Sequence, residues 1–142
     1  MALLRRKERE YAFMMIFEAL FHEGEDSSEL FERILENTDD PEVRENQYIR
    51  NIFFGVAEKK EELNGIISSL SPARKLSRIS KVSLALLQLA LFEIYHVEAI
   101  AESVSINEAV ELAKIYDDDK APSFINGLLG NAVREKNGEA KK

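Results

Sequence analysis

The stretch VSLALLQLALFEIYHV, residues 82–97, is the most apolar window of the chain. It contains no proline or glycine, and it is apolar on nearly every side of a helix, which is typical of a helix buried in a protein core. It is too short to cross a bilayer, and it includes Gln88 and Glu93. The stretch therefore predicts a buried central helix over 81–96, with Ser80 as its N-terminal cap.

Three helical segments are expected before this helix. Apolar residues at helical spacing predict a first helix over 4–22. A second, over 26–37, opens with residues that fit a capping box. A third pattern runs over 42–70, and Gly55 and Gly65 are candidates to bend or divide it.

The segments that flank the central helix on its other side are also helical in pattern. Residues 71–80 are polar, basic and broken by a proline, so they form the expected boundary between two halves. The SINE sequence of 105–108 is a capping box that predicts the start of the next helix. A last helix is expected from Pro122, and its Gly127 and Gly130 suggest the close approach of another helix.

The fold class predicted from these patterns is all-α. An N-terminal helical bundle with a basic first helix is expected over 1–70, followed by the basic linker 71–80 and a C-terminal helical bundle over 81–136. Residues 137–142 are expected to form a frayed tail. A chain of 142 residues can bury a real core, so the two halves are expected to pack as one compact domain.

The composition excludes several classes of protein. The chain has no cysteine, which rules out a disulfide scaffold, a thiol nucleophile and a thiolate zinc site. No secretory signal and no membrane-spanning segment is visible, so the protein is expected in the cytoplasm. His22 and His96 have no ligand cluster around them, and the acids 117–119 lack the spacing of a calcium loop. No phosphate loop or nucleophile motif is present, so no enzyme activity, cofactor or metal is expected.

The net charge of −7 is unevenly distributed. Residues 18–46 hold eleven acidic residues against two arginines, a net charge of −9, so the rest of the chain carries +2. Positive charge gathers over 5–9, over 74–81 and in the tail. The acidic segment favours a protein–protein adaptor that binds no nucleic acid, whereas the basic segments favour an anionic partner if the fold brings them together.

The first helix begins with positive charge, which interacts unfavourably with the helix macrodipole. The cost to helix stability is about 0.3–1 kcal/mol per charge. An RNA partner would offset this cost, since arginine pairs with phosphate and stacks on bases. The alternative is a solvated charged face, because two glutamates interrupt the run. The candidate RNA-binding cations are Arg5, Arg6, Lys7 and Arg9.

Five stretches resemble, in order and over nearly the whole chain, the NusB family of bacterial transcription antitermination factors. The combination of INEAVELAK, an aromatic residue and FINGLL is specific to that family. The matching stretches are RRKEREYAFMMIFEALF (5–21), YIRNIFFGVAEKKEELNGII (48–67), LSRISKVSLALLQLALFEI (76–94), VSINEAVELAKIYDDD (104–119) and SFINGLLGNAV (123–133).

The resemblance implies a fold of two packed three-helix bundles. It also implies a heterodimer with NusE, a ribosomal protein of the small subunit, that binds boxA-type RNA of ribosomal RNA leader transcripts within the RNA polymerase antitermination complex. The family's arginine-rich motif matches the basic run described above. Two family aromatics match Phe17 and Phe124, which are therefore candidate base-stacking platforms in RNA binding.

Some features leave alternatives open. The linker lacks the aromatic residue that many relatives have, and Lys120-Ala121-Pro122 replaces an acidic and serine-containing turn beside Phe124. The NusB-like domain of an RNA cytosine methyltransferase would share the same resemblance. Some relatives self-associate, which leaves a homodimer open, and no local motif marks the residues that contact NusE.

Overall fold

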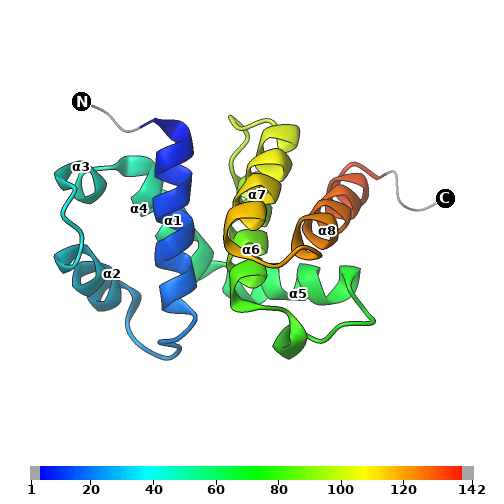
Figure 1. The fold of residues 1–142 in the computed structure, drawn as a ribbon, viewed down its shortest axis with the longest axis horizontal. Coiled ribbons are helices and arrows are strands. Elements are labelled where there is room, and N and C mark those ends of the chain that lie inside the picture. The colour runs from blue at the N-terminus through cyan, green and yellow to red at the C-terminus, as the bar shows by residue number, and fades with distance from the viewer. Residues whose placement is uncertain (1–3, 139–142) are drawn as a thin grey trace.

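The regular structure of residues 4–138, the part of the chain that the computed structural model describes, is entirely helical. The expected all-α class is therefore confirmed, while residues 139–142 of the expected frayed tail lie outside the described part. The elements, shown in Figure 1, are α1 (Arg5–Ala19), α2 (Ser27–Glu36), α3 (Pro41–Arg44), α4 (Gln47–Glu58), α5 (Lys60–Leu70), the 3-10 helix η1 (Leu76–Arg78), α6 (Lys81–His96), α7 (Glu102–Tyr116) and α8 (Ala121–Lys136).

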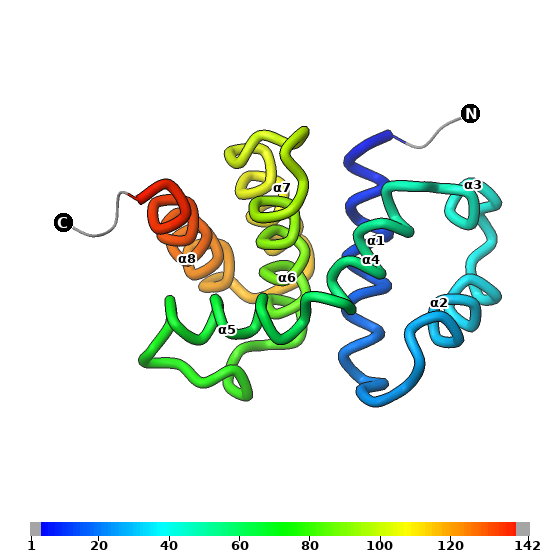
Figure 2. Tube along the Cα trace, turned by 180° about the vertical axis from the view of Figure 1, so that it is seen from behind, coloured from blue at the N-terminus to red at the C-terminus, as the bar shows by residue number. Residues whose placement is uncertain are grey.

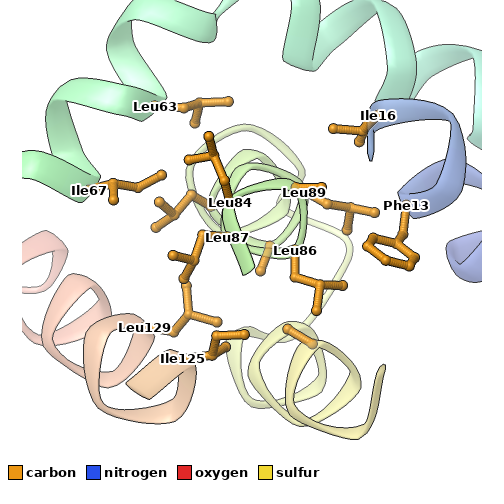
Figure 3. Close-up of a cluster of buried hydrophobic side chains, with 14 of the residues drawn as sticks. Phe13, Ile16, Leu63, Ile67, Leu84, Leu86, Leu87, Leu89, Ile125 and Leu129 are labelled. Atoms are coloured by element: carbon orange, nitrogen blue, oxygen red, sulfur yellow. The ribbon is translucent and has the colours of Figure 1, made fainter. Parts of the chain in front are cut away.

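Helix α6 is the centre of the fold, with the bounds that the sequence predicts. The Ser80 hydroxyl caps it by accepting a hydrogen bond from the backbone N–H of Ser83 at 3.0 Å. It packs against α1, α4, α5, α7 and α8, and its leucines point outward around the helix toward these neighbours (Figure 3). Leu87 and Leu91 have no exposed surface. A helix that is apolar all round thus finds partners on every side, as expected.

A second, smaller core lies on the far side of α1 and α4. It joins those two helices to α2 and α3, and its members include Phe31, Ile49 and Phe53. The Asp26 carboxylate caps α2 by accepting a hydrogen bond from the backbone N–H of Glu29 at 3.0 Å, which is half of the predicted capping box. Helices α1 and α4 therefore stand between the two cores.

The predicted helix over 42–70 is three helices, and neither glycine divides it. Asn46 starts α4 by accepting a hydrogen bond from the backbone N–H of Ile49 at 2.8 Å, and the chain turns again at Lys59. The turn carries α5 to the side of α6 and α8, away from α1–α3 (Figure 2). The expected grouping over 1–70 therefore needs correction: α5 packs with the C-terminal helices, because Leu63 and Ile67 are buried against them.

Two other local expectations were wrong. Helix α7 begins at Glu102, so Ser105 lies inside it and is not its cap. A side chain at Gly127 would meet no atom within 4 Å, so this glycine permits no close helix contact. The glycine that does is Gly55, where an added Cβ would overlap the ring of Phe92 on α6. In the described residues, no helix has the length and apolar character needed to span a membrane.

Candidate nucleic-acid interface

Three of the four predicted RNA-binding cations lie on the surface at the start of α1, and each is paired with a carboxylate. The guanidinium of Arg6 donates two hydrogen bonds to Glu108 on α7, at 3.1 and 2.8 Å, and this pairing lowers the pKa of Glu108. Surface ion pairs of this kind contribute only about 0–1 kcal/mol, so a phosphate could replace the carboxylate at small cost. The other two pairs are Arg5 with Glu8 (2.8 Å) and Lys7 with Glu10 (3.3 Å).

Arg9, the fourth predicted cation, is inside the protein. It is 2% exposed, and its Nε and Nη2 donate to Oε2 of Glu93 at 3.2 and 3.0 Å. The Tyr48 hydroxyl donates to the same oxygen, and Ser105 Oγ donates to Oε1 at 2.8 Å. Burial, and the carboxylate beside it, raise the pKa of Tyr48 far above its ordinary value. Arg9 therefore joins α1 to α4, α6 and α7, and it is not available for direct contact with RNA.

The sequence does carry a signal for this buried network. Arg9 stands three and four residues before Ala12 and Phe13, so it continues the apolar stripe of α1 that faces the core. Glu93 is the only acidic residue within the most apolar helix. A buried carboxylate needs a cation or several hydrogen-bond donors. A charged residue on each of two apolar helix faces, Arg9 and Glu93, therefore allows the prediction that the two form a buried ion pair.

Phe17, the first predicted stacking platform, is half-buried and lines an aromatic groove. The groove lies between α1, the start of α6 and the end of α7, and its other aromatic members include Phe21 and Tyr116. The rings of Phe17 and Phe21 meet edge to face with centroids 5.2 Å apart. Phe21 is 59% exposed, so the groove has an apolar rim that sequence analysis did not single out.

Phe124, the second predicted platform, is also half-buried and lines a separate groove beside the linker. The guanidinium carbon of Arg74 lies 4.3 Å from the centroid of its ring, a cation–π geometry. Val82, in the first turn of α6 directly after the linker, lines the groove around Phe17. Segment 74–82 therefore connects the two aromatic grooves.

The unpaired positive charge of the described residues lies in this linker more than at the start of α1. The three cations of the linker and the first residue of α6 are exposed, and none forms an ion pair within the part of the chain that is described: Arg74, Lys75, Arg78 and Lys81. Helices α2 and α3, which carry much of the acidic segment over 18–46, lie on the far side of α1 from α7 and α8 (Figure 1). Glu23 of the same segment pairs with Lys60 at 2.7 Å, and Lys60 and Lys81 help to lower its pKa, so the acidic segment also reaches the start of α5 and of α6.

The carboxylates of the acidic turn after α7 accept hydrogen bonds from groups at the starts of α6 and α8. Asp117 Oδ2 accepts hydrogen bonds from the hydroxyls of Ser80 and Ser83 at 2.6 and 2.7 Å. Asp118 Oδ1 accepts from the backbone N–H groups of Lys120 and Ala121, both at 3.0 Å, at the start of α8. Over residues 4–138, no cluster of three or more acidic or histidine side chains has the arrangement of a metal site.

Comparison with known proteins gives a consistent result. A profile described as the NusB family matches residues 6–134. The transcription antitermination protein NusB of Acetivibrio thermocellus is 43% identical, over 93% of this chain and 90% of that protein. The crystal structure of NusB from T. maritima superposes with a TM-score of 0.83 at 31% identity, covering 95% of this chain and 94% of that one. A NusB solved in complex with NusE and dsRNA shares the fold, with a TM-score of 0.75 at 24% identity over 94% of this chain and 99% of that one.

Proposed function

The chain belongs to the NusB family, and on that premise we propose that it is a transcription antitermination protein that binds boxA-type RNA of ribosomal RNA leaders together with NusE. The observation that carries the proposal is the 43% identity, over nearly the whole of both chains, to a protein named for antitermination. Because that relative is named as an antitermination protein over 90% of its own length, this reading is favoured over a methyltransferase domain.

The proposed RNA site combines exposed cations with stacking platforms. Phosphates would replace the carboxylates paired with Arg5, Arg6 and Lys7, and bases would stack in the aromatic grooves on Phe17 and Phe124. Arg9 is left out of this set because it is buried with its carboxylate partner.

The proposed role requires no catalysis and no cofactor. The protein would add binding surface to NusE and hold RNA within the RNA polymerase antitermination complex. Because that complex forms on nascent transcripts in bacteria, we place the protein in the cytoplasm.

A binding assay tests the proposal. Fluorescence anisotropy of a labelled boxA-type RNA is measured with the protein alone, with NusE alone and with both, at several salt concentrations. We expect the pair to bind more tightly than either protein, since the pair offers a wider surface. Three phosphate contacts at the start of α1 would contribute a slope of about −2 in log affinity against log salt, which changing the three exposed cations to alanine would remove.

The control is an RNA of the same length and composition with its sequence scrambled. Equal affinity for both RNAs, with or without NusE, would count against the proposal. The acidic segment around α2 and α3 favours a second candidate, an adaptor that binds proteins and no RNA. A tight complex with NusE whose affinity for RNA does not exceed that of NusE alone would identify the adaptor.

A further inference from the structure

We propose that a cavity between the end of α1, the start of α2 and the middle of α4 binds a small uncharged aromatic molecule, which donates one hydrogen bond to the side-chain oxygen of Gln88. The residues that line this cavity include none of those assigned to the RNA site above. The inference therefore goes beyond the proposed function and does not depend on it.

The cavity lies where the two cores of the protein adjoin. Leu20 and Val56 of the main core and Leu30 and Phe53 of the smaller core line it. Its volume is about 220 Å³, and the exposed turn over 23–25 forms its mouth. An apolar cavity of about 150 Å³ is enough to hold benzene. The size and the lining therefore suit one compact aromatic ring system.

Gln88 brings an unpaired hydrogen-bond acceptor to the cavity. This residue of α6 is 1% exposed and lines the cavity. Its Nε2 donates to Oδ1 of Asn64 at 2.9 Å, while no group of the described residues donates to its Oε1. Every fully enclosed side-chain oxygen or nitrogen of those residues has a partner, so Oε1 reaches accessible space, and the cavity is that space. An occupant with an N–H or O–H group would satisfy this oxygen.

A water molecule alone is a poor occupant of the inner part of the cavity. A buried water usually makes about three hydrogen bonds. Gln88 is the one polar residue among the buried residues that line the cavity, and the others are aliphatic or aromatic. A ring that carries a single donor satisfies Gln88, covers the apolar wall and releases poorly held water to the solvent.

The charges at the mouth favour an uncharged ligand. Glu23 pairs with Lys60 at 2.7 Å. Glu25 pairs with Arg33 and also accepts a hydrogen bond from His22 at 2.8 Å. Both carboxylates at the mouth thus have cationic partners already, so a charged ligand would find no unpaired counter-charge there.

A pair of isosteric probes tests the inference on the unchanged protein. Indole has one N–H donor, whereas benzofuran has nearly the same shape with an acceptor oxygen in place of the N–H. In titrations followed by NMR, we expect indole to bind with a dissociation constant of about 0.1–1 mM, which is ordinary for a ligand of this size. Benzofuran should bind about fivefold more weakly, the ratio that one neutral hydrogen bond supplies. Nuclear Overhauser contacts from indole to the methyl groups of Leu30 and Val56 should locate it.

Two variants and a matched control test the assignment of residues. Gln88→Met keeps the length of the side chain and removes the acceptor, so indole and benzofuran should bind it equally well. Ala19→Leu adds a side chain to the cavity wall and should weaken the binding of both probes. Ala101→Leu makes the same change at an exposed alanine just before α7 and should bind indole as the parent does. The melting temperature of each variant checks that it is folded, and the comparison of probes on the parent needs no variant.

Four results would overturn the inference. Equal affinity of the parent for indole and benzofuran would show an apolar cavity without a specific acceptor, and tighter binding of benzofuran would show a donor in its place. Contacts from indole to residues outside the cavity, or no binding of indole up to its solubility, would remove the site. Tryptamine, which adds an ammonium group to the indole ring, is expected to bind no more tightly than indole, and tighter binding would contradict the uncharged class. These titrations contain neither RNA nor NusE, so their failure would leave the proposed function standing.

Discussion

Changing Arg9 to methionine tests whether this residue holds the helices together or contacts RNA. Methionine has a similar length but removes the positive charge, which leaves the fully buried carboxylate of Glu93 with only the hydroxyls of Tyr48 and Ser105 as donors. Breaking one side of a buried ion pair costs about 3–5 kcal/mol. The entropy of unfolding of a 142-residue chain is about 0.3 kcal/mol/K, so the melting temperature should fall by about 10–17 °C.

Calorimetry of the parent and of Arg9→Met gives the stability, and Arg9→Met/Glu93→Met provides the matched control. The double variant removes both charges, so it should recover much of the loss that the single variant shows. The salt slope of RNA binding, measured well below the melting temperature, should not change in Arg9→Met, whereas Lys7→Ala should flatten it by about 0.7. A melting temperature within a degree of the parent, together with a flatter slope, would refute the buried assignment of Arg9.

Three further predictions concern packing and charge. Leu87→Ala should lower the free energy of unfolding by about 2–5 kcal/mol in chemical denaturation, because the residue is fully buried in the main core; a loss below 1 kcal/mol would contradict that burial. Gly55→Ala should lower the melting temperature, since its Cβ overlaps the ring of Phe92, while Gly127→Ala should raise it, since its Cβ meets nothing; a similar rise in both variants would show that helix propensity alone decides. A hydrogen bond from its arginine partner holds the pKa of Glu108 below its usual range, so this pair stabilises the fold above the unfolded pKa of about 4.3 and is lost as the pH falls through the lower folded value. Melting temperatures between pH 6 and pH 3 should therefore fall less steeply for Glu108→Gln than for the parent, and equal steepness would contradict the role of the pair.

Local signals predicted those features that depend on a few neighbouring residues. The bounds of α6 and its cap at Ser80 followed from apolar periodicity and a single hydroxyl. The same reasoning failed at Ser105, which has the sequence context of a cap but donates its hydroxyl to a carboxylate twelve residues earlier in the chain. A capping box and a buried hydrogen bond use the same side chain, so only the position of the neighbouring helix distinguishes them.

The division of the helices also depended on contacts that the sequence does not display. The periodic pattern of 42–70 continues through the turn at Lys59. Helices α4 and α5 each bury one face, and the buried residues Val56 and Leu63 on either side of the turn are seven positions apart, as they would be in one continuous helix. Gly55 and Gly127 look equivalent in sequence, yet one permits a close helix contact and the other faces open space. What surrounds a glycine is a property of the packed structure.

The sequence by itself determined that this protein is all-helical, where its central helix lies and to which family it belongs. Periodicity, caps and motifs are local, and short-range sterics and hydrogen bonding enforce them. The tertiary structure alone decided which of the basic residues are available to a partner. Arg9 is buried in an ion pair with Glu93, 84 residues away in the chain, and Arg6 is paired with Glu108, 102 residues away. The linker cations form no ion pair in the described residues. The apolar stripe of α1 places Arg9 on its core-facing side, but which carboxylate each arginine meets follows from how the helices pack, and no spacing rule along the chain gives that partner.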